Sequence, residues 1–424
     1  MVTLLTIGFA LNLLDRQIVN ILGELIKRDL GLADWQLGAL SGLSFALLYS
    51  TAAIPIARLA DRSNRVTIIG VAIITWSAFT AACGAASNFI QLLLCRVGVG
   101  VGEAGGAPPS QSLIADSVSP DRRSGALAVF ALGAPIGASI GLIGGGLLAG
   151  LIGWRWTMVA AGAPGILIGA LVLLTLRDPR DGRQGGPRAA EPSLRAALGQ
   201  LLAQRAFVLM ALGGALLSFV NYGAMAFAGS FYLRNHLSEL TELGARVGLP
   251  PLGVIGIGLG LLGASGGALG ALVGGKLGDR FGTRDVRALT IIPAVGSVFC
   301  AAGYLIMFTL PGALWSLATF ALASFFSNLW YGPGTLGLQR LAGPKAKATA
   351  LAVALFVNSA IGLSLGPLLI GIMSDAFTPA LGEGEALRAG ILIGLSAGLL
   401  SGLLYWFAAR SIDPEIRRAE AAVG

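Results

Sequence analysis

Long apolar stretches separated by short polar connectors dominate the chain from end to end. A helix that crosses a bilayer needs about 20 mostly apolar residues, and stretches of this kind recur along the whole sequence. The pattern predicts an all-α polytopic membrane protein with 12 transmembrane helices. The expected spans lie at about 2–26, 36–57, 66–87, 90–114, 124–149, 155–176, 207–232, 252–275, 287–309, 313–338, 347–373 and 387–409.

The longest polar connector divides the chain into two halves of equal span number. It is rich in Gly, Pro and Arg and follows the sixth span. We therefore expect an N-terminal six-helix bundle, a cytoplasmic linker, a C-terminal six-helix bundle and a cytoplasmic tail. Their predicted bounds are 1–176, 177–206, 207–410 and 411–424.

The basic residues are distributed unevenly between alternate connectors. Most lie in the linker, in the tail and after even-numbered spans, as at Arg122 and Arg123. Cytoplasmic connectors carry the excess of Lys and Arg in membrane proteins. Both termini should therefore be cytoplasmic, in the plasma (inner) membrane if the source is bacterial. The net charge of +8 then reflects topology rather than a nucleic-acid partner.

Composition agrees with the hydropathy pattern. Charged residues make up 12% of the chain, about half the usual share for a soluble protein. The cysteines Cys83, Cys95 and Cys300 lie in apolar runs without C-x-x-C spacing, so we interpret them as reduced core residues. The N-terminus has no basic region before its apolar run, which favours a first span over a signal peptide.

Short motifs for cofactors and catalysis are weak or absent. The Gly100–Gly105 stretch matches G-x-G-x-x-G but lies inside a long apolar span, where nucleotide binding is not expected. The sequence has no Walker motif, metal cluster or nucleophile triad, so we expect neither a cofactor nor an enzyme. The single histidine, His236, is expected to be solvated in an outer loop.

Two motifs recur at matching positions of the halves. "ARLADRSNR" (57–65) follows span two and "GKLGDRFGTR" (275–284) follows span eight, while "GAPIG" (133–137) and "GLSLGP" (362–367) lie in spans five and eleven. Equal span numbers with matching motifs indicate a duplicated six-helix unit in parallel orientation.

These motifs together resemble the major facilitator superfamily, over nearly the whole chain. "LADRSNR", "LGDRFGTR", "RVGVGVGEA" and the Gly-Pro pattern of span five carry the resemblance. "DRQIVN", "ADWQLGALSGLSFALLYS", "GVGEA" and "GWRW" are similar to the Spinster branch. The resemblance implies two pseudo-symmetric bundles, alternating access and a lysolipid or sphingoid-phosphate substrate, in some members with protons. Drug exporters and organic-anion carriers share much of this pattern.

Four charged residues lie well inside predicted spans: Asp15, Arg16, Arg96 and Glu103. A charge at the centre of a span costs about 2.5–3.5 kcal/mol, and buried ion pairs are poor stabilisers, which favours function over structure. Arg96 and Glu103 are seven residues apart, so they line one helix face about 10 Å apart. Asp15 and Arg16 point about 100° apart and should reach different groups.

We interpret Asp15 and Glu103 as proton-coupling acids. Arg16, Arg96 and Glu103, with Asn12, are the expected head-group contacts in the first half. The second half lacks such charges and offers Tyr222, Asn328, Trp330 and Asn358 among many phenylalanines, most of which also fit helix packing. A charged wall in one half and an apolar-aromatic wall in the other suit an amphipathic substrate.

The two repeated loops are expected to form the cytoplasmic gate, although a solvated basic turn would also explain them. By the resemblance, Asp61 faces the start of span eleven, Arg62 or Arg65 pairs with Asp116, and Asp279 faces the start of span five at Ser119 and Pro120. Arg280 and Arg284 complete the second loop.

Span five carries glycine every four residues, at Gly133, Gly137, Gly141 and Gly145. This is the small-xxx-small pattern of close helix contact, and Pro135 should bend the helix or free a carbonyl. In the superfamily that this chain resembles, the motif is associated with exporters. The sequence thus predicts a monomeric secondary transporter for an amphipathic anionic lipid. The alternatives are a drug or organic-anion exporter, a receptor that binds without transport, and an intramembrane enzyme using Asp15 and Glu103.

Overall fold

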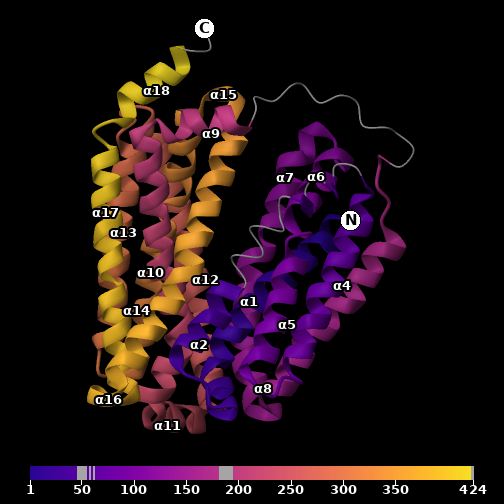
Figure 1. Cartoon of the computed structure of the whole chain (residues 1–424), viewed down its shortest axis with the longest axis vertical. Helices are drawn as coiled ribbons and strands as arrows, with labels where there is room; N and C mark the ends of the chain where they lie inside the picture. Colours follow the sequence, from indigo (N-terminus) through magenta and orange to yellow (C-terminus); the bar gives the residue numbers. More distant parts are fainter. Residues whose placement is uncertain (45–54, 57–58, 61–62, 181–193, 422–424) are drawn as a thin grey trace. The chain divides into compact units, whose positions relative to one another are not determined.

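A computed structural model describes residues 1–44, 55–56, 59–60, 63–180 and 194–421, and these residues form helices joined by short turns, with no strand among them (Figure 1). Contacts divide the chain into two compact units. Unit 1 comprises Met1–Pro187 with Met225–Gly260, and unit 2 comprises Arg188–Ala224 with Leu261–Gly424. Each unit is described by itself.

Unit 1 is built around the packing of α8 against α1 and α4, with α5 beside α4 (Figure 1). Two further helices, α10 and α12, begin or end in this unit and continue in unit 2. The elements of unit 1 are α1 (Val2–Leu30), α2 (Asp34–Gly38), a π-helix η1 (Ala39–Leu43), α4 (Arg65–Cys83), α5 (Phe89–Glu103), α6 (Ala107–Ser117), α7 (Pro120–Ala131), α8 (Gly133–Thr175) and α11 (Leu237–Val247), with parts of α10 (Arg205–Asn235) and α12 (Pro251–Gly282).

Unit 2 is centred on α13, which packs against α14 and α17 (Figure 1). Its elements are α9 (Leu194–Leu202), α13 (Ala288–Thr309), α14 (Ala313–Asn328), α15 (Tyr331–Val357), a π-helix η2 (Asn358–Leu363), α16 (Ser364–Gly394), α17 (Ser396–Ala408) and α18 (Ile412–Ala421), with the remaining parts of α10 and α12.

Among the described residues, 9 helical stretches are long and apolar enough to cross a membrane. Two of them, Pro120–Thr175 and Thr349–Ala408, each contain two of the expected spans. Inside these stretches Gly153 and Gly382 have positive φ angles of 75° and 77° and break the helix between the spans. The expected span at 36–57 falls largely outside the described residues. The architecture is therefore that of a multi-pass integral membrane protein and is consistent with 12 spans.

The glycine row of α8 packs directly on α1, as its four-residue spacing predicts. A Cβ on Gly133 would lie 2.7 Å from the Thr6 carbonyl oxygen, and a Cβ on Gly137 would collide with the Ala10 carbonyl. The helix is interrupted at Leu132, three residues before Pro135. Proline has no N–H for the carbonyl four residues earlier, but Leu132 keeps a helical backbone conformation (φ −62°, ψ −21°), so the effect of Pro135 stays a prediction.

Three short amphipathic helices lie in segments that hydropathy marks as polar. Helices α9 and α18 pack against α15, where Leu201, Ile412 and Ile416 join the buried core of unit 2. Helix α11 places Leu240 in the interior of unit 1. These helices are too short and too polar for a span, so a search for 20-residue apolar stretches does not find them.

Candidate functional site

The intramembrane charges of the first half gather in unit 1, on α1 and α5. Asp15, Arg96 and Glu103 are 1%, 2% and 1% exposed, whereas the Arg16 side chain is 23% exposed. Asn12 is buried beside them. The sequence therefore found residues that the fold does bring together, and Arg16 is the cation of this cluster that a solute reaches first.

Arg16 and Glu103 form the closest ion pair of this cluster. Arg16 donates to Glu103 Oε2 from Nε at 2.9 Å and from Nη2 at 2.8 Å. Asn12 also contacts Glu103, while Asp15 lies beside Thr80 of α4 and within electrostatic reach of Arg96. Asp15 and Arg16 thus reach different groups, as their angular separation predicts.

Several polar atoms of this cluster are buried without a hydrogen-bond partner among the described residues. They include Asp15 Oδ1 and the Nε and Nη1 atoms of Arg96. Glu103 Oε1, Trp76 Nε1 and Thr80 Oγ1 are in the same condition. Buried polar groups are normally paired, so this cluster retains free capacity to bind protons or a polar ligand.

Glycines of α5 allow α4 to approach this charged face closely. A Cβ on Gly102 would lie 2.8 Å from the Trp76 backbone nitrogen, and a Cβ on Gly98 would lie 2.6 Å from the Phe79 ring. This is the close approach of small residues that membrane helices use. The "RVGVGVGE" stretch therefore carries its charged residues and its closely packed glycines on different faces of α5.

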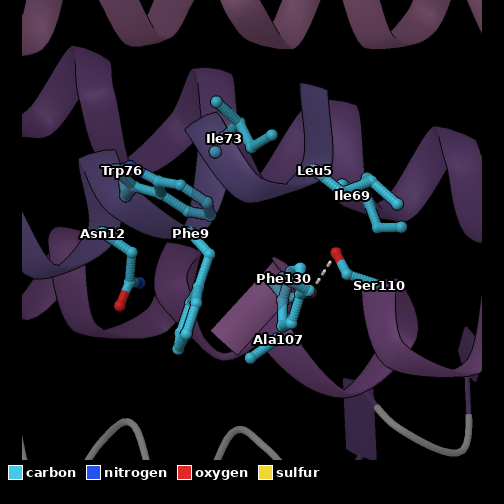
Figure 2. A pocket seen from close by; sticks show the side chains of 11 residues that line it. Leu5, Phe9, Asn12, Ile69, Ile73, Trp76, Ala107, Ser110 and Phe130 are labelled. Carbon is cyan, nitrogen blue, oxygen red and sulfur yellow. Dashed lines mark hydrogen bonds between the residues drawn. The ribbon is translucent and has the colours of Figure 1, made fainter. Parts of the chain in front are cut away.

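A small cavity of about 10 Å³ lies next to Asn12 and is lined by Trp76, Ser110, Phe9 and Phe130 among others (Figure 2). This is close to the smallest space that holds one water molecule. The Ser110 hydroxyl donates to the Gly106 carbonyl at 2.8 Å. A larger groove of about 410 Å³ lies between α1 and α8 and is lined almost wholly by aliphatic side chains and glycine.

The first of the two repeated loops, residues 57–65, ends at Arg65. Arg65 is the centre of a second charged cluster. This side chain is 1% exposed and donates from Nη1 to Asp116 at 2.7 Å, the partner expected for Arg62 or Arg65. It also donates to both carboxylate oxygens of Asp178, at 2.9 and 2.5 Å. Asp61 and Arg62 lie outside the described residues. The gating role of this loop stays a prediction.

Asp178 and Arg180 belong to this cluster and were missed by sequence reasoning. Arg180 donates to Asp116 from Nε at 3.0 Å and from Nη2 at 2.8 Å. Hydrogen bonds from Arg65 hold the pKa of Asp178 well below its ordinary value. The available signal was their position, since "RDPR" directly follows span six, but the linker hid it among other arginines.

The second repeated loop, residues 275–284, includes the C-terminal end of α12 at the surface of unit 2. Asp279, Arg280 and Arg284 are all exposed, and none forms an ion pair within the described part of the chain. The Arg280 guanidinium lies 5.7 Å from the Phe281 ring centre. As expected, α7 begins at Pro120 directly after Ser119, although the Ser119 hydroxyl does not cap it.

The polar residues proposed for the second half lie in unit 2 but are not joined by described contacts. Tyr222 is 37% exposed, and Trp330 packs on Tyr331 with ring centres 5.9 Å apart. The Asn328 amide donates to the Ser324 carbonyl at 3.0 Å, which is a local helix contact. Asn358 begins the π-helix η2, and its Oδ1 is buried without a partner among the described residues.

His236 is not solvated as expected. Its side chain is 5% exposed and its ring packs against Phe231 and Tyr232, with ring centres 5.5 and 5.8 Å away. The prediction was wrong because His236 lies between two helices, α10 and α11, whose turn folds the imidazole inward.

Ionisable residues buried inside a multi-pass helical bundle are typical of functional sites in membrane proteins. The family model of the Major Facilitator Superfamily matches residues 5–367. The chain therefore belongs to the major facilitator superfamily, within its Spinster branch, and is a transporter.

Relatives and solved structures agree on this assignment. An MFS-type efflux pump of Mycolicibacterium smegmatis is 33% identical, covering 94% of this chain and 89% of its own. The sphingosine-1-phosphate transporter SPNS2 of Mus musculus is 28% identical, covering 88% and 69%. The crystal structure of a bacterial homologue of the human lysosomal transporter Spinster, inward-facing and unoccupied, has a TM-score of 0.88 at 29% identity, covering 98% and 97%.

Proposed function

We propose that this protein is a proton-coupled secondary transporter that exports an amphipathic anionic lipid, such as a lysolipid or a sphingoid phosphate, by alternating access. One observation carries the proposal: a partly exposed arginine, Arg16, is paired with a buried acid, Glu103. An anionic head group and Glu103 compete for the same guanidinium. A proton on Glu103 settles this competition in favour of the head group.

Protonation of Glu103 removes the negative charge that holds Arg16. Charge-assisted hydrogen bonds are about twice as strong as neutral ones, so neutral Glu103 releases the guanidinium for another anion. Binding of the proton and of the anionic head group therefore support each other, and the coupling is reciprocal. Two ligands that bind together are carried together, so the expected mode is co-transport of proton and anion. A proton then leaves with each exported anion, and the outward gradient of the lipid itself must drive export.

Asp15 and Arg96 form a second acid–base set for the same step. Arg96 has unpaired N–H groups but is 2% exposed, so a ligand reaches it only after the cluster rearranges. Asp15 lies within electrostatic reach of Arg96 and Glu103. A change in the charge of one of these groups therefore alters the electrostatic interactions of the other two. We therefore assign Asp15 to proton coupling, and Arg96 to a head-group contact formed after Arg16 engages the ligand.

The apolar-aromatic surface of the second half is the proposed site for the lipid tail. Tyr222, Asn328, Trp330 and Asn358 combine apolar area with a few hydrogen-bonding groups, as ligand pockets do. The relative named for sphingosine-1-phosphate transport and the relative named as an efflux pump support an amphiphilic substrate and outward transport. Both termini and the Arg65 cluster are proposed to face the cytoplasm.

The test is uptake of a labelled lysolipid or sphingoid phosphate by proteoliposomes, with imposed pH gradients of either direction. We expect the fastest transport when the proton and lipid gradients point the same way. Asp15→Asn should weaken this dependence, and Asp121→Asn, an exposed acid on α7, is the matched control. Transport that ignores the pH gradient in every variant would refute proton coupling and leave a facilitator.

The second candidate is an exporter of drugs or organic anions, which the efflux-pump relative favours. It predicts transport of amphiphilic drugs or organic anions by the same vesicles, with no transport of lysolipid. A receptor that binds without transport would show saturable binding of the lipid and no accumulation of label inside the vesicles.

A further inference from the structure

A third charged cluster lies in unit 1, toward the C-terminal end of α1, the helix that also carries Asp15 and Arg16. It joins the end of α1 and the start of α2 to the end of α10, and we call it the outer cluster. Glu24, Asp34 and Arg234 are 1%, 0% and 3% exposed at their side chains. Its members are Glu24, Lys27, Arg28, Asp34 and Arg234.

Arg234 binds both acids of the outer cluster at once. Its Nη1 donates to Asp34 Oδ2 at 2.8 Å and its Nη2 to Asp34 Oδ1 at 2.7 Å, a two-pronged pair. Its Nε donates to Glu24 Oε2 at 2.8 Å. Only the planar guanidinium of arginine presents donors in this arrangement. Arg234 is thus the single cation that connects α10 to two acids on α1 and α2.

Each acid also has a cation close by in its own region of the chain. Lys27 donates to Asp34 Oδ1 at 2.9 Å, and Arg28 donates to Glu24 Oε1 at 3.0 Å. If α10 withdrew with Arg234, neither carboxylate would remain buried without a counter-charge. An unpaired buried charge is the main cost of breaking such a pair, so these two cations lower the cost of separation.

The backbones of α10 and α1 also fit closely next to this cluster. A Cβ on Gly229 would lie 3.3 Å from the Ile21 carbonyl oxygen, and a Cβ on Gly23 would lie 3.9 Å from Ser230 Oγ. Ser230 is fully buried. The Met225–Asn235 part of α10 groups with unit 1, whereas the earlier part groups with unit 2. The contact therefore holds one end of a helix that both units share.

We propose that the outer cluster is a second gate of the transport cycle, in which Arg234 closes α10 onto α1 and α2 while Lys27 and Arg28 hold the two acids when it opens. Glu24, Asp34 and Arg234 are then further functional residues of the transporter. The assignment goes beyond the proposed substrate, because the gate acts on the carrier's conformation rather than on the head group.

The test measures how often the contact opens, using a cysteine at position 230 and a maleimide reagent on the full chain in lipid nanodiscs. Cys83 and Cys95 are replaced by serine, and buried Cys300 on α13 stays as an internal monitor of general unfolding. Mass spectrometry then gives the labelling rate of each cysteine separately. The readout needs no substrate, so it remains valid if the lipid proposal fails.

Arg234→Gln should raise labelling of Ser230→Cys about tenfold, equal to about 1.4 kcal/mol, with Cys300 unchanged. Arg234→Lys, which keeps the charge but loses the two-pronged geometry, should lie between. Arg246→Gln is the matched control, since Arg246 is an exposed arginine on α11. Lys27→Gln should act in the opposite direction and slow labelling, because Asp34 then depends more on Arg234.

Equal labelling of the intact and Arg234→Gln proteins would overturn the gate. Faster labelling in Lys27→Gln would overturn the role given to Lys27 and Arg28, because it would show that any charge loss loosens this contact. Faster labelling of Cys300 alongside position 230 would show general unfolding and would also count against the gate.

Discussion

At the residue scale, Glu103 and Arg16 set the proposed chemistry. Glu103 is 1% exposed and holds Arg16 through one carboxylate oxygen, while the other oxygen has no partner among the described residues. A glutamine at this position resembles protonated glutamate in shape and charge. It therefore isolates the effect of the proton from that of the side chain's size.

For Glu103→Gln we expect anionic-amphiphile affinity that no longer depends on pH, because the side chain at position 103 that faces Arg16 no longer gains or loses a proton. In the unmodified protein affinity should fall as pH rises, by about tenfold or 1.4 kcal/mol over the range where Glu103 ionises. Equilibrium binding of a labelled lysolipid at a series of pH values measures this. Glu385→Gln, at an acid with a 55% exposed side chain, is the control. Retained pH dependence in Glu103→Gln would contradict the mechanism.

Asp178 gives a second prediction at this scale, for stability rather than transport. Hydrogen bonds from Arg65 lower the pKa of Asp178 in the folded protein. Its stabilising effect is therefore complete above the unfolded value of about 4 and is lost as pH falls through the lower, folded value. Asp178→Asn should cost about 3 kcal/mol at neutral pH, as for a broken buried pair, and flatten the decline in stability below pH 4.

Thermal unfolding of the purified protein at several pH values tests this prediction. Asp121→Asn makes the same change at a 72% exposed acid, 3.7 Å from Arg122, and should have little effect because exposed pairs contribute little. A neutral-pH melting temperature that Asp178→Asn leaves unchanged would show that the Arg65 cluster contributes nothing to stability.

At the element scale, the contact of α8 with α1 depends on the absence of side chains at the glycine row. Its first three members face backbone atoms of α1, whereas Gly145 faces the side chains of Ile18 and Ile21, so an added methyl group at the first three positions meets atoms that cannot rotate away. The same helix carries Gly144, where a Cβ would meet nothing within 4 Å. Alanine substitutions at Gly137 and Gly144 therefore separate the effect of packing from that of helix propensity.

Gly137→Ala should destabilise the protein by about 1–3 kcal/mol, the usual cost of overpacking, because its Cβ collides with the Ala10 carbonyl. Gly144→Ala should be neutral or stabilising, since alanine is favoured over glycine in helices by up to about 1 kcal/mol. Melting temperatures of the two variants measure the difference. Equal shifts of the same sign would mean that the row does not set the packing distance.

At the scale of the whole molecule, the charge of the substrate should decide how proton and substrate movements are related. In the proposed mechanism an anionic amphiphile binds Arg16 after Glu103 is protonated, so proton and anion bind to the same state. A cationic amphiphile would instead compete with the proton for Glu103. In a carrier that works by alternating access, two ligands that favour each other's binding are transported together, and two ligands that compete for one site are exchanged.

We therefore expect opposite responses to one pH gradient from one protein. Transport of a lysolipid anion in proteoliposomes should quicken when the proton gradient points along the lipid gradient. Any transport of a cationic amphiphile should quicken when the gradients are opposed. Responses of the same sign would show that the proton acts elsewhere in the cycle.

Much of the fold followed from the chain alone because a bilayer imposes strong local rules. Unsatisfied backbone groups are too costly in hydrocarbon, so long apolar runs must be helices, and the glycine spacing predicted the contact of α8 with α1. The spans broken by Gly153 and Gly382, and the charges Asp15, Arg16, Arg96 and Glu103, were equally visible. These features depend on residues close in sequence or on the cost of burying single charges.

The pairing of those charges was decided only by tertiary structure. Arg16 rather than Arg96 binds Glu103, Arg65 reaches Asp178 across 113 residues, and Arg234 meets Asp34 across 200. Amphipathic α18 and the buried ring of His236 also escaped the sequence. Composition and periodicity show which side chains a helix must bury. The packing of distant helices decides which partner each charged side chain contacts, because an ion pair depends on distances that local sequence does not encode.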